Sequence, residues 1–305
     1  KLEAPMKMEV LDRCGICAAS DLEQVDPDNN LCRCRTCGFV FDNPRPTLEE
    51  IGHYYSQPSQ YDSWLDRIEA RDDLWRRRLA KLLPIHKPGS LLDIGAGIGQ
   101  FLHHARPHFT TVAGTELSDS AIIIARDKYN LPLIKGDVLD IDFDNSTRFD
   151  NITIFHVLEH VPDPRATIKK CYRLLSDGGL LVVCVPNDLR SLKRNAKSSA
   201  KRFFRSVGIN RWRDPGRLGL PRIALDGSMD EIHLSHFTSS VLHRLLTDNG
   251  FTVVQNSVDP YFVASGARLV LEKMYCAGMS ATRIVLRRNW YETIWMAAYK
   301  NIDSD

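Results

Sequence analysis

The sequence predicts an α/β fold in which helices cover both faces of a mainly parallel sheet, preceded by a small cysteine-rich module. From Ser90 onward, short runs of branched and aromatic residues alternate with amphipathic segments, which is the pattern of parallel strands joined by crossover helices. Five of the eight cysteines lie before residue 45. A chain of 305 residues is long enough to bury a large core beside such a module.

The module, residues 1–45, is predicted to be a zinc ribbon. Its two C-x2-C pairs are separated by sixteen residues, a spacing at which two tight turns converge on one tetrahedral zinc: Cys14, Cys17, Cys34 and Cys37. A structural zinc would contribute about 10 to 16 kcal/mol of apparent binding free energy to folding so small a segment. Cys32 could replace Cys34 at a poorer spacing, and the alternative to a metal is a disulfide or unpaired thiols. The remaining cysteines are expected as small core residues: Cys171, Cys184 and Cys276.

Residues 46–88 are predicted to connect this module to the main domain. The part from Pro44 to Tyr61 is rich in proline, tyrosine and polar residues and is expected to be a connector. Apolar residues then recur at roughly helical spacing: Trp64, Leu65, Ile68, Trp75, Leu79, Leu82 and Leu83. This pattern predicts an amphipathic helix, interrupted near Arg71, that either packs on the next domain or forms a lid over a ligand.

A strand, a glycine-rich turn and a helix follow at Ser90–Ile94, Gly95–Gly99 and Gln100–Ala105. Gly95, Gly97 and Gly99 would let the backbone approach a ligand closely, and Glu116, which ends the next strand, could accept hydrogen bonds from two ribose hydroxyls. Asp93 would repel a phosphate but could hold an ammonium group. The alternative for Asp93 is a turn or helix-capping acid.

The same alternation predicts the remaining elements. Strands are expected at Leu131–Val138, Phe149–Val157, Gly179–Val185, Phe251–Val254 and Thr293–Lys300, and helices at Ser118–Tyr129, Pro164–Leu175 and Ala267–Gly278. Ligands of such sheets bind at the carboxyl ends of the strands. His156, Glu159 and His160 lie at one of these ends.

These three residues form an H-x-x-E-H sequence, the pattern of the inverted zinc proteases. That chemistry needs both histidines on one face of a helix. The preceding residues are those of a strand, and Pro162 and Pro164 follow at once, so the segment is predicted to be a strand that runs into a loop. His156 and His160 therefore need not share a metal.

Several motifs in order resemble a class I S-adenosylmethionine-dependent methyltransferase: LLDIGAGIGQF, Glu116, KGDV, FDNITIFHVLEHVPDP, DGGLLVVCVPN and HLSHFTSSVLHRLLTDNGFTVV. The N-terminal CGIC and CRTCGFVFDNPRPTLEEIGHYY resemble the zinc ribbon of bacterial sugar- and glycan-modifying methyltransferases, whereas LEHVPDP also resembles the quinone-pathway O-methyltransferases. The resemblance implies a Rossmann-like, seven-stranded sheet with an antiparallel last strand over residues 89–305.

The resemblance also implies a set of cofactor residues. Asp93 and the three glycines would surround the methionine part of the cofactor, Glu116 would bind the ribose, and Asp137 with Val138 would frame the adenine. Because the cofactor is a sulfonium cation, acids and open backbone suit it better than a phosphate cradle.

Methyl transfer is an in-line displacement in which a neutral thioether leaves, so aligning the acceptor is the main task. A sugar hydroxyl is a weak nucleophile while protonated, and a general base adds about 10² to 10⁴ in rate. His156 is the first candidate for the base, followed by His160 and Glu159; the alternative is that the latter two orient the loop. His233 and His236 are expected to bind the acceptor, unless they are packing histidines.

The insertion 188–230 is strongly basic. Between Asp188 and Arg222 it holds eleven basic residues and two acids, interleaved with apolar side chains: Phe203, Phe204, Val207, Ile209 and Trp212. Such a segment could bind a nucleotide diphosphate, an anionic lipid surface or RNA, or be a solvated basic loop.

The leading hypothesis is methyl transfer to a sugar or glycan, nucleotide-linked or lipid-linked, with O-methylation slightly ahead of C-methylation. The rivals are an RNA methyltransferase and a non-catalytic module that retains the cofactor fold. Net charge is +2, so nucleic acid is not expected as a partner. Without an apolar run of spanning length or a signal-peptide core, the chain is expected in the cytoplasm, with peripheral contact to the inner face of the membrane as an option.

Overall fold

The computed structural model describes residues 6–55, 68–209, 214–226, 229 and 231–302, without the side chains of residues 48, 52, 53 and 55. Its centre is a seven-stranded sheet with the strand order β12-β13-β10-β9-β6-β7-β8. The strands are β6 (Ser90–Ile94), β7 (Thr111–Glu116), β8 (Ile134–Lys135), β9 (Phe149–Phe155), β10 (Leu175–Pro186), β12 (Phe251–Ser257) and β13 (Thr293–Lys300). The last strand, β13, is antiparallel to both of its neighbours. The predicted fold class, a Rossmann-like sheet with an antiparallel last strand, is therefore confirmed.

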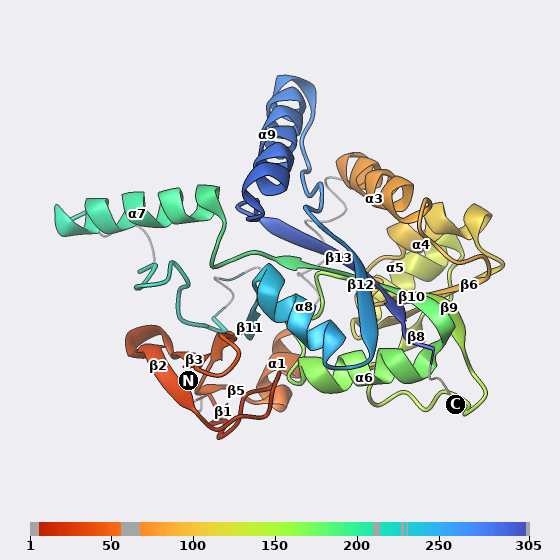
Figure 1. The fold of residues 1–305 in the computed structure, drawn as a ribbon, viewed down its shortest axis with the longest axis horizontal. Coiled ribbons are helices and arrows are strands. Elements are labelled where there is room, and N and C mark those ends of the chain that lie inside the picture. The colour runs from red at the N-terminus through yellow and green to blue at the C-terminus, as the bar shows by residue number, and fades with distance from the viewer. Residues whose placement is uncertain (1–5, 56–67, 210–213, 227–228, 230, 303–305) are drawn as a thin grey trace.

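The strands bury alternate side chains on opposite faces, and each face has its own layer of helices (Figure 1). On β6, Leu91 packs in one cluster with residues of α3 (Ile68–Leu82), α4 (Gln100–Ala105) and α5 (Asp119–Tyr129). Its neighbour Leu92 packs in the other cluster with residues of α6 (Pro164–Leu174) and α8 (Ser239–Thr247). Because this sheet is covered on both faces, its ligand-binding positions lie at the strand ends.

Asp163 and Pro164 explain why the chain leaves the loop after β9 and starts a helix. The Asp163 carboxylate accepts a hydrogen bond from the backbone N–H of Ala166 at 2.9 Å, and Pro164 occupies the first helical position, where no backbone donor is needed. The prolines that predicted the end of the strand therefore also fix the start of α6.

The N-terminal module contains β1 (Met8–Glu9), β2 (Leu22–Asp26), β3 (Leu31–Cys34), β4 (Val40–Asp42), β5 (Arg45–Pro46) and a short 3-10 helix (Pro27–Asn29). Its four-stranded sheet has the order β11-β4-β3-β2, in which β11 (Ser235–His236) comes from the distant part of the chain. Ser235 pairs with Phe41 and His236 with Val40. The module and the main domain are thus joined by a shared sheet.

Several element predictions differ from the structure. The expected connector contains α1 (Leu48–Tyr55), and its pattern of Thr47 followed by glutamates in the first turn is a helix-start signal. The helix α3 is continuous through Arg71, while Trp64 and Leu65 lie outside the described residues. The basic insertion forms α7 (Leu192–Ser206), which begins at a Ser191 cap. The strand expected at Leu131–Val138 is much shorter in the structure. Only β8 pairs, and it lies at the edge of the sheet next to β7.

Two helices extend away from the body of the molecule. α7 and α9 (Gly266–Leu286) project in different directions from the ends of β10 and β13 (Figure 1). α9 is longer than the predicted 267–278 and exposes several apolar side chains: Val270, Leu271, Met274, Ile284, Val285 and Leu286. Among the helices of the described residues, none combines the length and apolar character that crossing a bilayer requires.

Candidate active site

The glycine turn after β6 has the backbone conformation that only glycine adopts easily. Gly95, Gly97 and Gly99 have φ values of 69°, 55° and 78°. A Cβ on Gly95 would lie 2.3 Å from Cγ2 of Val157, which belongs to the loop after β9. Glycine is therefore needed both for the turn and for the close approach of the two loops.

Glu116, at the end of β7, holds this turn in place. Its carboxylate accepts hydrogen bonds from the backbone N–H groups of Gly97 at 2.7 Å, Leu117 at 2.8 Å and Ser118 at 2.9 Å. Leu117 itself is 58% exposed, so an apolar side chain stands open to solvent beside the acid. The sequence reasoning missed Leu117, although an apolar residue directly after a strand-end acid could have drawn attention to it.

Asp93 lies one strand from Glu116 and is buried. Thr153 on β9 donates a hydrogen bond to its carboxylate at 2.6 Å, whereas the adjacent helix α4 has no side-chain cap. Burial raises the pKa of Asp93 to about 7, against the lowering effects of this hydrogen bond and of Arg78. A cation nearby would favour the ionised carboxylate.

The other two cofactor candidates follow β8, the strand next to β7. Asp137 accepts a hydrogen bond from the backbone N–H of Leu139 at 2.8 Å, and Val138 is buried in the core. Because β7 and β8 are parallel neighbours, these residues lie at the same edge of the sheet as Glu116.

His156 begins an irregular loop rather than a helix. Its φ is 57°, in the left-handed region, and its backbone N–H donates to the carbonyl of Cys184 at 2.9 Å. The turn at residues 158–160 follows directly. His156 and His160 are therefore not one helical turn apart on a helix, and the geometry of a zinc protease is absent from this segment.

Two buried carboxylates flank the imidazole of His156. Nδ1 lies 3.3 Å from Oε1 of Glu159, and Nε2 lies 3.6 Å from Oδ2 of Asp259, which is a charge contact rather than a hydrogen bond. The ring packs against Tyr261, with centroids 4.8 Å apart. Burial disfavours the charged ring, but Asp259 and Glu159 outweigh it and raise the pKa of His156 above 6.5.

Arg78 pairs with Asp259 behind this histidine. The guanidinium is 1% exposed and the carboxylate 0% exposed, and Nε lies 3.1 Å from Oδ1. The guanidinium also lies over the ring of Phe155, 4.9 Å from its centroid. Sequence reasoning missed both residues, although Arg78 sits on the apolar stripe of its helix, where an arginine is unexpected.

Replacing Arg78 with methionine should lower the free energy of unfolding by about 3 to 5 kcal/mol, because it leaves the buried Asp259 carboxylate without its partner. Urea unfolding followed by circular dichroism measures this change. Arg76→Met, on the exposed side of the same helix, is the matched control and should change stability by less than about 0.5 kcal/mol. Equal stabilities of the two variants would show that the buried pair is not needed.

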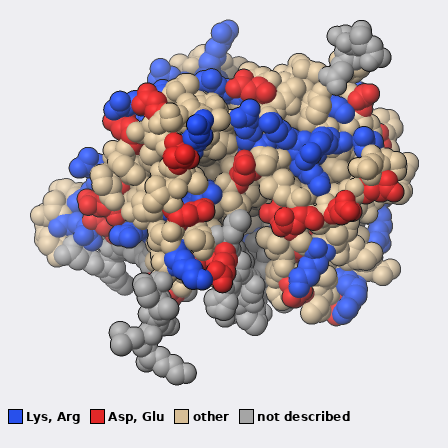
Figure 2. Space-filling view, turned by 90° about the horizontal axis from the view of Figure 1, so that it is seen from below, with Lys and Arg blue, Asp and Glu red and all other residues tan. Residues whose placement is uncertain are grey.

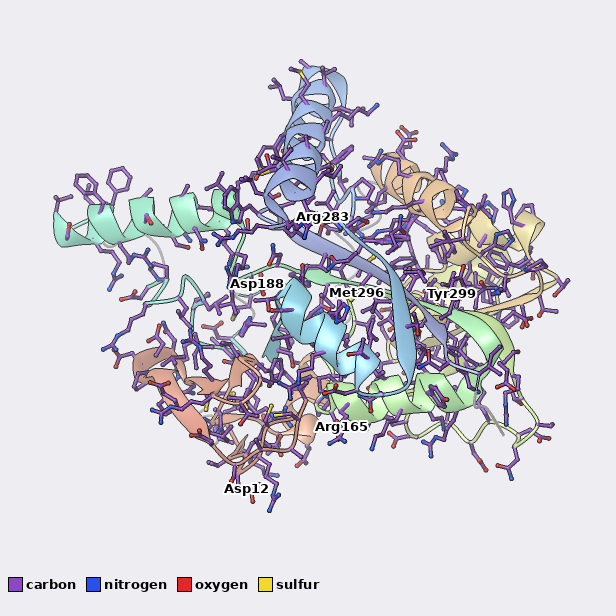
Figure 3. All side chains as sticks on the ribbon, viewed as in Figure 1. Asp12, Arg165, Asp188, Arg283, Met296 and Tyr299 are labelled. Carbon is purple, nitrogen blue, oxygen red and sulfur yellow. The ribbon has the colours of Figure 1, made fainter. Side chains whose placement is uncertain are left out.

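The predicted substrate histidines lie in different surroundings. His233 is partly exposed, with Nδ1 3.0 Å from Oδ2 of Asp188. His236 is buried between Asp188, at 3.2 Å from Nδ1, and Asp42 of the N-terminal module, at 3.0 Å from Nε2. Asp188 follows β10, near the root of α7 (Figure 3). His236 thus links the module to the main domain, whereas His233 faces His160, with ring centroids 5.0 Å apart.

The four cysteines of the two C-x2-C pairs meet in the N-terminal module. The sulfurs of Cys14 and Cys37 are 3.5 Å apart, as are those of Cys17 and Cys34, and all four sulfurs lie within 4.8 Å of one another. The thiols are free, and this arrangement fits one tetrahedral metal with four thiolate ligands. Cys32 is buried on β3 outside this group.

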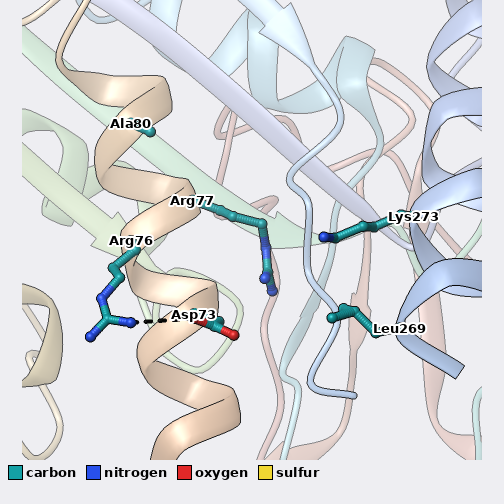
Figure 4. Close-up of a pocket in the computed structure, with 6 residues that line it drawn as sticks. All are labelled: Asp73, Arg76, Arg77, Ala80, Leu269 and Lys273. Carbon is teal, nitrogen blue, oxygen red and sulfur yellow. Dashed lines mark hydrogen bonds and ion pairs between the residues drawn. The ribbon is translucent and has the colours of Figure 1, made fainter. Parts of the chain in front are cut away.

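A cleft of about 320 Å³ lies between α3 and α9 (Figure 4). Three basic residues line it together with one acid: Arg76, Arg77, Lys273 and Asp73. Arg77 donates a hydrogen bond to the carbonyl of Phe262, next to the Tyr261 that packs on His156. The cleft therefore adjoins the candidate site through this short segment.

Comparisons with solved structures find methyltransferases at low identity, with TM-scores just below 0.5. A SAM-dependent methyltransferase from Archaeoglobus fulgidus is 17% identical, with a TM-score of 0.49, over 78% of this chain and 100% of that one. An S-adenosylmethionine-dependent methyltransferase from Clostridium acetobutylicum is 14% identical, with a TM-score of 0.49, over 79% of this chain and 96% of that one.

Curated relatives match by sequence over part of the chain. Demethylmenaquinone methyltransferase of Staphylococcus saprophyticus is 30% identical over 115 residues, 35% of this chain and 49% of that protein. The Staphylococcus aureus enzyme of the same name is 30% identical over 119 residues, 37% of this chain and 48% of that protein. The chain thus spans about half the length of the curated relatives it matches. A family profile described as "Methyltransferase domain" matches residues 67–256, more than half of the chain. The chain therefore belongs to this methyltransferase domain family, a family of enzymes.

Proposed function

We propose that this protein transfers a methyl group from S-adenosylmethionine to a hydroxyl group of a sugar or glycan. The main support is the arrangement at the carboxyl ends of three neighbouring strands. The glycine turn with Asp93 and Glu116 offers open backbone and acids to a cationic cofactor, and β9, which carries His156, is paired with β6. O-methylation is favoured over C-methylation because a hydroxyl gains most from a basic side chain at this position.

The residues have distinct roles in the proposed reaction. Bound S-adenosylmethionine supplies an electrophilic methyl group. Glu116 would accept hydrogen bonds from its ribose, Asp93 would balance its positive charge, and the apolar Leu117 would contact its base. His156 would take the proton of the acceptor hydroxyl as the hydroxyl oxygen is methylated. Glu159 and Asp259 orient the imidazole and stabilise its charged form.

Calorimetry with S-adenosylmethionine tests the cofactor part of this proposal. Glu116→Gln should raise the dissociation constant about 10- to 150-fold, because about 1.5 to 3 kcal/mol of hydrogen bonding to a charged group is lost. Asp140→Asn, an exposed acid near the same edge, is the control and should leave it unchanged. Absence of binding to the unmodified protein would reject the enzyme function in favour of a non-catalytic module.

The helix α7 favours a lipid-linked acceptor. An apolar stripe runs along it next to a basic one, and every member of the apolar stripe is exposed: Leu192, Ala196, Ala200, Phe203 and Val207. Phe203 alone is 64% exposed. A basic amphipathic helix of this kind binds in the interface of an anionic bilayer, with its apolar side chains inserted among the lipids. We therefore propose peripheral contact of α7 with a membrane that holds the acceptor.

Sedimentation with vesicles that contain anionic lipid tests this contact. The double variant Phe203→Ser, Val207→Ser should lower the partition constant by more than tenfold, because burial of each apolar side chain contributes about 1.5 to 3 kcal/mol. Ile123→Ser, an exposed apolar residue on α5, is the matched control. Binding that is equal in both variants, or that persists in neutral vesicles, would contradict the proposal.

A nucleotide-linked acceptor is the second candidate, favoured by the basic cleft between α3 and α9, whose guanidinium and ammonium groups suit phosphate. RNA has less support. On the face seen in Figure 2, basic side chains are bordered by acidic ones. A labelled-methyl assay that compares nucleotide sugars, lipid-linked glycans and RNA distinguishes the three acceptors.

We also propose a structural zinc at Cys14, Cys17, Cys34 and Cys37. The support is the convergence of the four sulfurs, which leaves no coordination position open for a substrate. Cys14 and Cys34 pack in the same core cluster as Phe237 of the main domain, so the zinc would also stabilise that contact.

A further inference from the structure

We propose that Glu159, His160 and His233 bind one divalent transition-metal cation, in a second metal site distinct from the four cysteines. The three residues each offer a ligand atom, and these atoms lie within 4.8 Å of one another. Two of the residues come from the loop after β9 and the third from the segment before β11. The packing of the two segments therefore assembles the site.

Glu159 provides the strongest indication of a missing cation. Its side chain is 0% exposed, and neither carboxylate oxygen accepts a hydrogen bond from the described residues. The nearest imidazole nitrogens are Nδ1 of His156, at 3.3 Å, and Nε2 of His160, at 3.8 Å. A buried carboxylate without donors is costly, and a metal ion supplies the missing positive charge.

In both histidines, Nε2 is the ring nitrogen left to bind a metal. Nδ1 of His160 lies 2.6 Å from the carbonyl oxygen of Ile232 and so must donate, which assigns the lone pair to Nε2. Nδ1 of His233 donates to Asp188, and its Nε2 has no hydrogen bond among the described residues. A carbonyl or carboxylate behind the imidazole is the usual outer partner of a metal-binding histidine.

The surrounding charges also favour a cation. His233 lies among the carboxylates of Asp188, Glu159 and Glu231, with Nε2 3.5 Å from Glu231. These carboxylates place negative charge around the ligand atoms, which a metal cation at Nε2 of His233 would balance.

Two imidazole nitrogens and one carboxylate suit Zn²⁺, Fe²⁺, Co²⁺ or Mn²⁺ better than Mg²⁺, which prefers oxygen ligands. Three protein ligands leave a coordination position open, unlike a four-cysteine site. The H-x-x-E-H sequence thus supplies metal ligands through its glutamate and second histidine, while its first histidine, His156, stays outside the ligand set.

If the proposed function holds, on which this step rests, the open position would bind the acceptor hydroxyl. The cation would lower the pKa of that hydroxyl, and its proton would pass to the adjacent His156 while the oxygen attacks the methyl group. The metal would then also orient the acceptor, which is the main requirement of an in-line displacement.

Metal content of the full-length protein tests the site without cofactor or acceptor, so its failure is separate from a failure of the proposed function. After equilibration with Zn²⁺ and removal of excess metal, the protein should hold two equivalents by mass spectrometry. Glu159→Gln and His233→Gln should each reduce this to one. His243→Gln, an exposed histidine on α8, is the control and should keep two.

Cobalt substitution gives a second readout that does not require any variant to fold. The Co²⁺ form of the unmodified protein should show intense thiolate charge-transfer bands from the cysteine site and a separate, weaker visible spectrum from a nitrogen and oxygen site. A single equivalent with only the thiolate spectrum would overturn the proposal. So would folded Glu159→Gln and His233→Gln variants that retain two equivalents.

Discussion

Replacing His156 with asparagine should lower the turnover number about 10² to 10⁴-fold, because the acceptor hydroxyl loses its general base. Asparagine is chosen because it tolerates the left-handed backbone at φ 57° better than alanine does. The dissociation constant for S-adenosylmethionine should stay the same, since Asp93 and Glu116 lie on other strands. A labelled-methyl assay and calorimetry measure the two quantities.

The unmodified enzyme should show the matching pH dependence. A general base acts in its neutral form, so turnover of protein without a metal at Glu159 should fall as the pH drops through the pKa of His156, which Asp259 and Glu159 raise above 6.5 despite burial. The acid limb of the pH profile should therefore lie above that value and disappear in His156→Asn.

The exposed His243 offers a control with the same chemical change. His243→Asn should keep both turnover and pH profile. Near-normal turnover of His156→Asn would reject His156 as the base, and weakened cofactor binding would instead indicate a structural role.

Removing the proposed zinc from the N-terminal module should unfold that module. Cys34→Ser deletes a fully buried ligand, and most of the about 10 to 16 kcal/mol of binding free energy should be lost with it. Phe39, which lies 5.3 Å from Phe41 and 5.6 Å from Phe237 between ring centroids, would leave its stack. Limited proteolysis should then cleave residues 6–46 rapidly, and mass spectrometry should find one equivalent of zinc fewer than in the unmodified protein.

Turnover should fall as well, because β11 loses its partner strand and His236 loses Asp42. Cofactor affinity should change little, since Glu116 and Asp93 are held by the main sheet. Cys32→Ser, a buried cysteine outside the cluster, is the matched control and should retain the metal. Protease resistance of Cys34→Ser would show that the module folds without its metal.

Local patterns in the sequence predicted the fold well where each element follows its own periodicity. The glycine turn, the strand-end acid Glu116 and the Asp163–Pro164 helix start can all be identified from neighbouring residues. The length of the edge strand β8 was overestimated. That length depends on how far β8 pairs with β7, which the local sequence does not reveal. α7 was missed although its start at Ser191 and the helical spacing of Leu192, Ala196, Ala200 and Phe203 are local signals.

The site was only partly predictable for a related reason. Arg78 and Asp259 are 181 residues apart, and each looks like an ordinary charged residue until the fold pairs them. Likewise, nothing near Asp188 or Asp42 in the sequence indicates that both carboxylates contact His236 in the fold. Pairing between distant segments is set by tertiary packing, which short-range patterns do not encode.

The pairing of β11 with β4 of the N-terminal sheet affects folding during synthesis. The partners Asp42 and His236 are separated by 194 residues, and translation at about 5 to 20 residues per second would take roughly 10 to 40 seconds to cover that distance. During this time the edge of β4 emerges from the ribosome without its natural neighbour. Because an unpaired strand edge can recruit other chains, the nascent polypeptide has a window in which shielding by a chaperone would protect it from aggregation.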